Sequence, residues 1–327
     1  MRFCTIFTLS CLSAAAFAEG TNDVDRIDQT HAEWSEWVTD TANQIDSFFS
    51  NEHADEAAQK TRLRVFVRFR YDGNEGAKVS PGIRAKISLP SVENRLHLML
   101  GNEEDATRIN DIDNKQQNIS LQFKPRADKP WQQLHYDIGI RRRDGKYQPY
   151  GRIRHSKTFQ TKSPWVPQVS NSFYYFTKSK FEYRGEASFD RILGPHLFFR
   201  PTSVLRWYQK NSDQCDDGWC FDQYFSLYEK LRRSRSEAIA YDAEIYLRDK
   251  PQFTLHDAVF KTRYRRMTSK EWLFWEIEPA IHFPDEYDHE PTFRVTFRIE
   301  GIFGHNDRVD INQNFMPVES PWENENP

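Results

Sequence analysis

The sequence has 327 residues, with 45 lysines and arginines against 48 aspartates and glutamates and a formal charge of −3. This near balance gives no support for a nucleic-acid partner, which would favour an excess of basic residues. Beyond residue 18, no stretch approaches the roughly 20 apolar residues that a membrane-spanning helix needs. A membrane location would therefore require strands, and only a closed barrel satisfies the backbone of such strands in lipid.

Residues 1–18 predict a cleaved signal peptide. A basic residue precedes a short apolar core, and Ala16-Phe17-Ala18 forms a small-x-small cleavage site. Cys11 raises the alternative of a lipoprotein, but the three residues before it make a poor lipobox. Export favours a disulfide between the remaining cysteines, Cys215 and Cys220, which would close a small loop.

Residues 19–60 predict an amphipathic helix from about His31 to Phe49 and then a polar linker to Lys60. One face carries apolar side chains at helical spacing: Trp34, Trp37, Val38, Thr41, Ile45, Phe48 and Phe49. The opposite face carries Glu33, Glu36, Asp40, Asn43 and Asp46. Three placements are open, because the helix could plug a barrel lumen, pack beneath the barrel or lie on the periplasmic leaflet.

Residues 61–71 show the pattern on which the fold prediction depends. Leu63, Val65, Val67, Phe69 and Tyr71 fall on one side of a strand. Arg62, Arg64, Arg68 and Arg70 fall on the other side, interrupted only by Phe66. Because this pattern recurs behind a secretory signal, the sequence predicts a barrel with lipid outside and water or polar side chains inside.

The predicted fold is an all-β, antiparallel transmembrane β-barrel over residues 61–303, with about 14 strands (range 12–16) after the N-terminal helix. The expected strands are 61–71, 82–89, 94–101, 117–124, 133–141, 147–158, 167–177, 180–190, 196–208, 220–231, 237–248, 253–265, 271–283 and 292–303. The sixth, seventh, ninth and tenth segments alternate poorly. With a periplasmic N-terminus, the long links 101–116, 209–219 and 284–291 fall outside the cell, where barrel loops are longer.

Several stretches resemble a known group of proteins. They are Ile45-Asp46-Ser47-Phe48-Phe49, Lys86 to Pro90 with Asn94 to Leu98, Tyr264-Arg265-Arg266, Glu271 to Pro279 and Arg298 to Gly304. Together they resemble a proteobacterial family of exported outer-membrane β-barrel proteins of unassigned function, which implies fold and location but no activity. The last strand ends at Phe303, yet residues 304–327 follow as a predicted periplasmic tail, whereas many such barrels end at the closing aromatic residue.

The inward-facing charges are the main candidates for a functional site. The lumen-lining candidates are Arg62, Arg64, Arg68, Arg70, Arg84, Lys86, Arg95, Glu182, Glu186, Glu244, Glu276, Glu278, Arg294 and Arg298. Early strands are mainly basic and later strands mix acids with arginines. Two interpretations stay open: the charges line a conducting pore and set its selectivity, or they pair across strands and fill a closed interior.

The sequence favours no catalytic residue, cofactor or metal site. His155 and Ser156 are adjacent, so on a strand their side chains face opposite sides and form no dyad. The Asp213 to Asp217 loop lacks the spacing of an EF-hand, and no Cys or His spacing suggests zinc. The aromatic run Ser172 to Phe176 is most simply an interfacial girdle.

The leading functional prediction is a passive, porin-like channel or small-solute transport protein in the outer membrane of a Gram-negative bacterium. Its expected partners are outer-membrane lipid, the outer-membrane assembly machinery and small polar solutes. The alternative is a non-conducting structural or partner-binding barrel. A lipid-modifying enzyme is less favoured, because the sequence shows no dyad.

Overall fold

The computed structural model describes residues 23–49, 61–89, 95–101, 118–125, 132–143, 146–210, 218–231, 236–250 and 252–304 with positions 311 and 315, and the side chains of the helix from residue 33. The predicted signal peptide, the linker, Cys215 and most of the C-terminal tail lie outside these residues and stay predictions. One helix, α1 (Asp23–Phe49), precedes fourteen strands.

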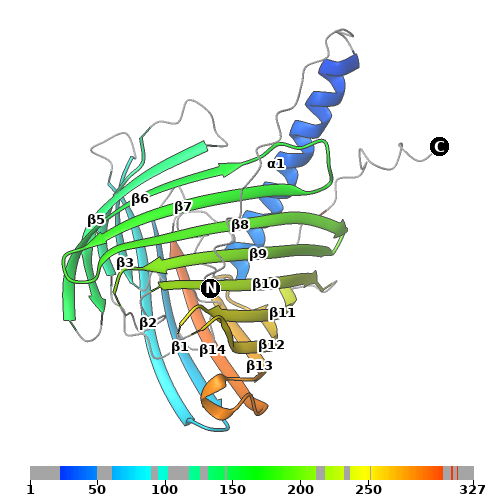
Figure 1. Ribbon diagram of the computed structural model, residues 1–327. Helices are drawn as coiled ribbons and strands as arrows, with labels where there is room; N and C mark the ends of the chain where they lie inside the picture. Colours follow the sequence, from blue (N-terminus) through cyan, green and yellow to red (C-terminus); the bar gives the residue numbers. More distant parts are fainter. Residues whose placement is uncertain are drawn as a thin grey trace, which may run out of the picture.

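The strands form one closed antiparallel barrel, which confirms the predicted fold and the count of 14 (Figure 1). They are β1 (Arg62–Asp72), β2 (Gly76–Leu89), β3 (Leu96–Gly101), β4 (Asn118–Phe123), β5 (Gln132–Arg143), β6 (Lys146–Thr158), β7 (Val166–Phe176), β8 (Lys180–Gly194), β9 (Leu197–Tyr208), β10 (Gly218–Lys230), β11 (Glu237–Arg248), β12 (Thr254–Met267), β13 (Leu273–His282) and β14 (Thr292–Gly304). Closure is made by β1 and β14, which pair from Arg62 with Gly304 to Asp72 with Arg294.

The second strand begins earlier than the sequence predicts. The expected start was residue 82, whereas β2 begins at Gly76 and pairs with β1 from that residue onward. Residues 76–82 contain Gly76, Pro81 and Gly82, which are residue types depleted in strands. The tight β1–β2 turn holds them in register, so backbone pairing extends over residues of low strand propensity.

The barrel has two rims. At the α1 rim, β1 begins and β14 ends; at the far rim, β1 turns into β2. Because successive strands run in opposite directions, the connections 102–117, 209–217 and 283–291 all belong to the far rim. The longest connections therefore fall on the rim opposite the helix, as the sequence predicts.

Burial alternates along the strands in the reverse sense of a water-soluble barrel. On β5, Ile138 is 68% exposed and points outward, whereas Asp137 and Arg141 of the same strand are buried. The same holds around the wall, where outward side chains include Val65, Phe69, Val79, Ile83, Ile119, Phe260, Ile277 and Phe293. An apolar exterior over a polar interior is the arrangement that lipid requires of a barrel. Within the described residues, no helix combines the length and apolar character needed to cross a bilayer.

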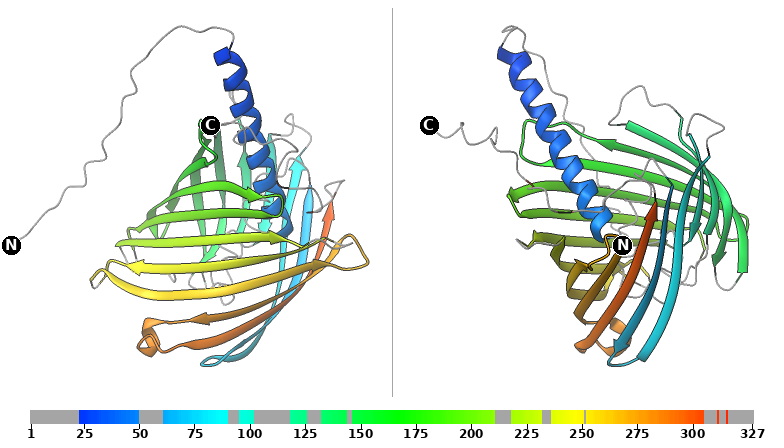
Figure 2. Two further views of the ribbon diagram at one scale, coloured as in Figure 1. Left: turned by 90° about the vertical axis from the view of Figure 1, so that its right-hand side faces the viewer. Right: turned by 180° about the vertical axis from the view of Figure 1, so that it is seen from behind.

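The largest apolar cluster lies inside the barrel at the α1 rim. Trp34, Val38, Ala42, Ile45, Phe48 and Phe49 of α1 belong to it, together with inward side chains at the strand ends. Phe48 meets Phe274 edge-on at 5.9 Å between ring centroids, and Phe49 meets Tyr228 at 5.4 Å. The C-terminal half of α1 thus lies in the barrel mouth, while its N-terminal part extends away from the strands (Figure 2). The helix begins at Asp23, earlier than the expected start near His31.

Candidate functional site: the charged interior

The structure places the predicted lumen candidates mainly in buried positions. Ten are buried: Arg62, Arg64, Arg70, Arg84, Lys86, Glu182, Glu244, Glu276, Arg294 and Arg298. Arg68, Glu186 and Glu278 are partly buried on their strands, and Arg95 lies just before β3 at the α1 rim. Strand alternation brings these side chains to one side of the sheet, because inward positions recur at every second residue.

The wall formed by β8 to β14 is held by ion pairs between neighbouring strands. Lys261 Nζ lies 2.7 Å from Glu244 Oε1, and Arg263 Nε lies 2.8 Å from Asp242 Oδ2. Arg248 donates a 3.0 Å hydrogen bond to Asp222. The acidic side chains on this wall are thus matched by cations, and their charges largely offset one another.

Arg265 occupies the centre of one such group. Its side chain is buried, donates to Glu276 and Glu300, and lies 4.9 Å over the Phe274 ring. Arg298 donates to the other oxygen of Glu300 at 2.7 Å. Two arginines and two glutamates therefore form a network across β12, β13 and β14, next to the cluster that holds α1.

The wall formed by β1 to β6 carries an excess of cations among its described residues. Its inward basic side chains are Arg62, Arg64, Arg68, Arg70, Lys78, Arg84, Lys86, Lys124, Arg141, Arg152 and Arg154. Inward acids on the same strands are Asp72 and Asp137, and Asp137 accepts a 2.8 Å hydrogen bond from Arg152. Glu75 in the β1–β2 turn pairs with Arg70 at 2.7 Å and with Lys78 at 3.1 Å. The described part of this wall is therefore net positive, in contrast to the balanced wall of β8 to β14.

Phe66, the apparent exception to the basic pattern of β1, is part of this wall. Its ring lies 5.0 Å from the guanidinium carbons of both Arg68 and Arg298 and 5.7 Å from that of Arg84. The ring also covers Gly82 on β2, where an added Cβ would lie 2.2 Å from a ring atom. Cation–π contacts thus let one aromatic ring hold three arginines together. The break in the alternation of β1 was the only sign of this role in the sequence.

A second aromatic group inside the barrel was also missed. The run Ser172 to Phe176 was expected to be an interfacial girdle, but only Phe173 and Tyr175 point outward. Tyr174 and Phe176 face inward and stack at 5.9 Å, and the Arg141 guanidinium lies 5.6 and 5.5 Å from their centroids. Strand alternation divides the run between the two sides of the wall.

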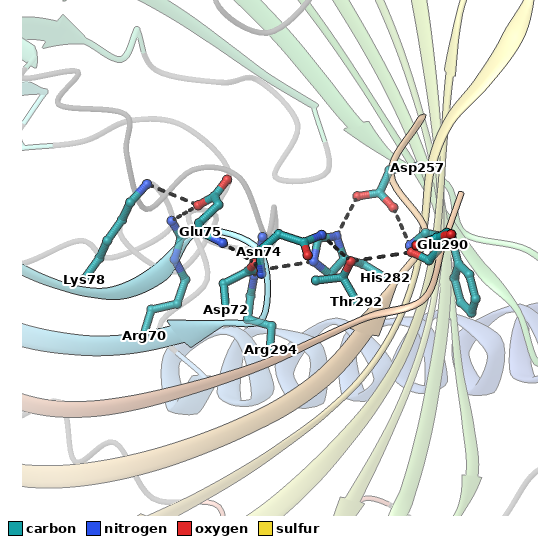
Figure 3. Close-up of polar contacts among 11 residues, drawn as sticks. Arg70, Asp72, Asn74, Glu75, Lys78, Asp257, His282, Glu290, Thr292 and Arg294 are labelled. Atoms are coloured by element: carbon teal, nitrogen blue, oxygen red, sulfur yellow. Dashed lines mark hydrogen bonds and ion pairs between the residues drawn. The ribbon is translucent and has the colours of Figure 1, made fainter. Parts of the chain in front are cut away.

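A hydrogen-bonded network joins neighbouring strands at the far rim (Figure 3). Asp72 accepts from Arg294 Nε at 2.6 Å, from the backbone of Asn74 at 2.9 Å and lies 3.2 Å from His282 Nε2. His282 Nδ1 lies 3.4 Å from Asp257. The network joins the β1–β2 turn to β12, β13 and β14. His282 is thereby held between the carboxylates of Asp72 and Asp257.

The described residues show no other constellation that suggests chemistry. His155 points outward from β6 and Ser156 points inward, so the two side chains lie on opposite sides of the wall. Among the described side chains, no group of three or more His, Cys, Asp and Glu residues could hold a metal ion. Cys220 is buried on β10, while its predicted disulfide partner Cys215 lies outside the described residues.

An ion pair anchors α1 to the barrel wall. Arg200 of β9 contacts Asp46 of α1 through Nη1 at 2.6 Å and Asp190 of β8 through Nε at 2.6 Å. Asp46 was predicted on the polar face of the helix, and in the structure it is only 4% exposed. Because the helix enters a charged lumen, its polar face also forms an ion pair there, between Asp46 and Arg200. Trp37 Nε1 further donates to the Phe315 carbonyl at 2.5 Å.

Loss of the Asp46 carboxylate should loosen the end of α1. We expect Asp46→Asn to speed hydrogen exchange at the amides of residues 45–49 by roughly tenfold, because a hydrogen bond to a charged group contributes about 1.5–3 kcal/mol. Asp40→Asn removes an exposed acid of the same helix and should leave the exchange unchanged. Equal exchange rates in the two variants would show that the Arg200 pair does not hold the helix.

Comparisons with known proteins support no assignment beyond the fold. Neither a family model nor a curated protein matches the chain. Similar solved structures include a bacterial polysaccharide outer-membrane secretin (12% identity, 75% of this chain and 99% of that chain, TM-score 0.45). Others are the outer-membrane channel DcaP of Acinetobacter baumannii (9%, 74% and 96%, 0.44) and a loop-deletion mutant of the outer-membrane protein OmpT of Vibrio cholerae (7%, 74% and 98%, 0.45). At these identities and scores the likeness assigns no function, and the family resemblance seen in the sequence stays a prediction.

Proposed function

We propose that the protein is an integral outer-membrane β-barrel of a Gram-negative bacterium, exported through its signal peptide. The support is the apolar outer belt around a closed, charged interior. Contact with hydrocarbon would be unfavourable for the charged interior, and contact with water would be unfavourable for the apolar belt. Outward aromatic side chains lie near both rims, such as Tyr147 and Phe181 at the far rim and Phe303 at the α1 rim. The partners in this proposal are membrane lipid and the assembly machinery that inserts such barrels.

The proposed location predicts a depth-dependent cost for charge on the outer surface. Ile138→Arg places a cation at mid-strand and should lower the free energy of unfolding from lipid vesicles by about 2–4 kcal/mol. Tyr147→Arg places the same cation near the far rim, where the cost should fall to about 0–1 kcal/mol. Urea titrations of both variants measure the difference. Equal, small effects would argue that mid-strand positions meet water.

We further propose that the barrel is a passive channel for small polar solutes, with a preference for anions. The observation that carries this proposal is the greater number of basic than acidic side chains among the described inward residues of β1 to β6, opposite a wall on which the two are nearly equal in number. Charged side chains that line a pore set its selectivity by attracting the opposite sign. Anionic solutes would therefore be concentrated along β1 to β6.

The channel proposal is tested by recording the mature protein in planar bilayers under a KCl gradient. The expected result is discrete current steps and a reversal potential of the sign for chloride permeation. Replacing Arg68 and Arg84 by glutamate should move that potential toward cation selectivity, whereas Lys178→Glu in the exposed β7–β8 turn should leave it unchanged. Current steps without a preference for anions would reject the proposed selectivity but not the proposed channel.

A non-conducting, partner-binding barrel is the second candidate, and one observation favours it. α1 lies in the barrel mouth, and positions Ile311 and Phe315, which follow the last strand, are buried in the same apolar cluster. Segments from both ends of the chain thus meet at the α1 rim. If the protein shows no current with or without α1, this second function is the better one.

A further inference from the structure

The outer surface of β6 to β10 interrupts the apolar belt with polar and small side chains at and near mid-strand. Asn171 is central among the outward side chains of β7, and His155 on β6 is its cross-strand neighbour. The set comprises His155, Asn171, Gly185, Ala187, Ser203 and Gln223, which are linked by strand pairing and which we call the β6–β10 patch.

No comparable patch occurs elsewhere on the described barrel. On the remaining strands the outward side chains at mid-strand are apolar, for example Val67, Ile138 and Phe297, with Thr262 as the exception. The patch therefore marks one side of the belt. It contains no acidic side chain, lysine or arginine, since its polar members are a histidine, two carboxamides and a hydroxyl.

Hydrogen bonds within the patch are incomplete. Tyr183 lies across Gly185, where an added Cβ would be 2.5 Å from the phenol oxygen, and donates to Asn171 Oδ1 at 2.7 Å. Within the described residues, neither the amide nitrogen of Asn171 nor the ring of His155 has a hydrogen-bond partner. Ser203 and Gln223, in contrast, bond to each other at 2.6 Å. An amide group without a hydrogen-bond acceptor is unfavourable in hydrocarbon. A polar partner inside the membrane would therefore stabilise the Asn171 amide.

We propose that the β6–β10 patch is the surface by which two copies of this chain associate; the inference rests on the proposed membrane location. Lipid chains offer no acceptor, whereas a carboxamide is both donor and acceptor and can pair with its own copy. Copies inserted in the same orientation are related by an axis along the membrane normal, so residues at equal depth meet in a self-complementary interface. Ala187 and Ser203 are small enough to let the two walls approach closely.

Native mass spectrometry of the mature protein in mild detergent tests this inference. The wild type should be a dimer, and Asn171→Leu should raise the dissociation constant by roughly tenfold, as loss of membrane hydrogen bonds predicts. Phe297→Leu, an outward change on β14, should leave the dimer intact. A wild-type protein that is folded, requires detergent and is monomeric at all concentrations would overturn the inference.

Cross-linking in native outer membranes identifies the occupant. A benzophenone amino acid at position 205, beside the patch on β9, should give an adduct of twice the chain mass, whereas one at position 138 on β5 should not. Adducts with a different protein, or equal adducts from both positions, would overturn self-association. A chain that dissolves without detergent would reject the membrane location as well, so the two failures are distinguishable.

Discussion

Deleting residues 19–60 should raise the single-channel conductance of the protein at least about twofold, because a helix with its side chains is about 10–12 Å across and α1 lies in the barrel mouth. The helix contacts inward side chains on several strands, including Phe274 and Tyr228, and its Asp46 carboxylate reaches Arg200. Removing it exchanges packed apolar side chains for water at this rim. Single-channel recording of the full and deleted chains measures the change directly.

Adding back the missing helix is the control for this experiment. A synthetic peptide of residues 23–49 should reduce the current of the deleted chain, and the same peptide with Phe48→Asp and Phe49→Asp should have a weaker effect. These aromatic side chains are buried between α1 and the barrel wall. If the deleted chain conducts no more than the full chain, α1 does not limit passage.

Arg265→Leu should lower the free energy of unfolding by about 3–5 kcal/mol, the cost of removing one partner from a buried ion pair. The substitution would leave Glu276 and Glu300 without the guanidinium that both contact. Arg298 would then be the remaining partner of Glu300 in this network. The measurement is urea unfolding from lipid vesicles, followed by tryptophan fluorescence.

The neighbouring Arg266 provides a matched control. Its side chain is 33% exposed and lies 3.5 Å from Glu237 at the outer side of the α1 rim. Arg266→Leu should cost less than Arg265→Leu, because Arg266 is partly exposed and the buried Glu237 keeps its 2.7 Å hydrogen bond from Tyr264. Similar losses for both variants would contradict the central role of Arg265 in the interior network.

The fold could be predicted because most strands carry a strict two-residue alternation. In β1, β13 and β14, apolar residues point outward and charged residues point inward. A shift by one residue would reverse this arrangement, so the pattern specifies which side of each strand faces outward. The sixth, seventh, ninth and tenth segments alternate poorly in the sequence, and the structure gives the reason. His155, Asn171, Ser203 and Gln223 are outward polar residues on these four strands, so the pattern fails where the outer surface itself is polar.

The interior could be predicted as a set of residues but not as a set of pairs. The basic character of β1 is evident from its arginines. Asp46 and Arg200, however, are 154 residues apart, and their contact depends on how α1 enters the barrel. Phe66 likewise looked like an interruption, since its role requires Gly82 on the next strand and Arg298 on the last. Such contacts follow from closure of the barrel and carry no local signal.

Nitroxide labels placed singly along residues 135–140 of β5 test most directly whether the outer belt meets lipid. In membranes, labels at positions 136, 138 and 140 should be relaxed mainly by oxygen, which concentrates in hydrocarbon. Labels at 135 and 137 should respond more to a water-soluble nickel complex than the outward labels do. Preferential nickel accessibility at 136, 138 and 140 would contradict the membrane-embedded barrel.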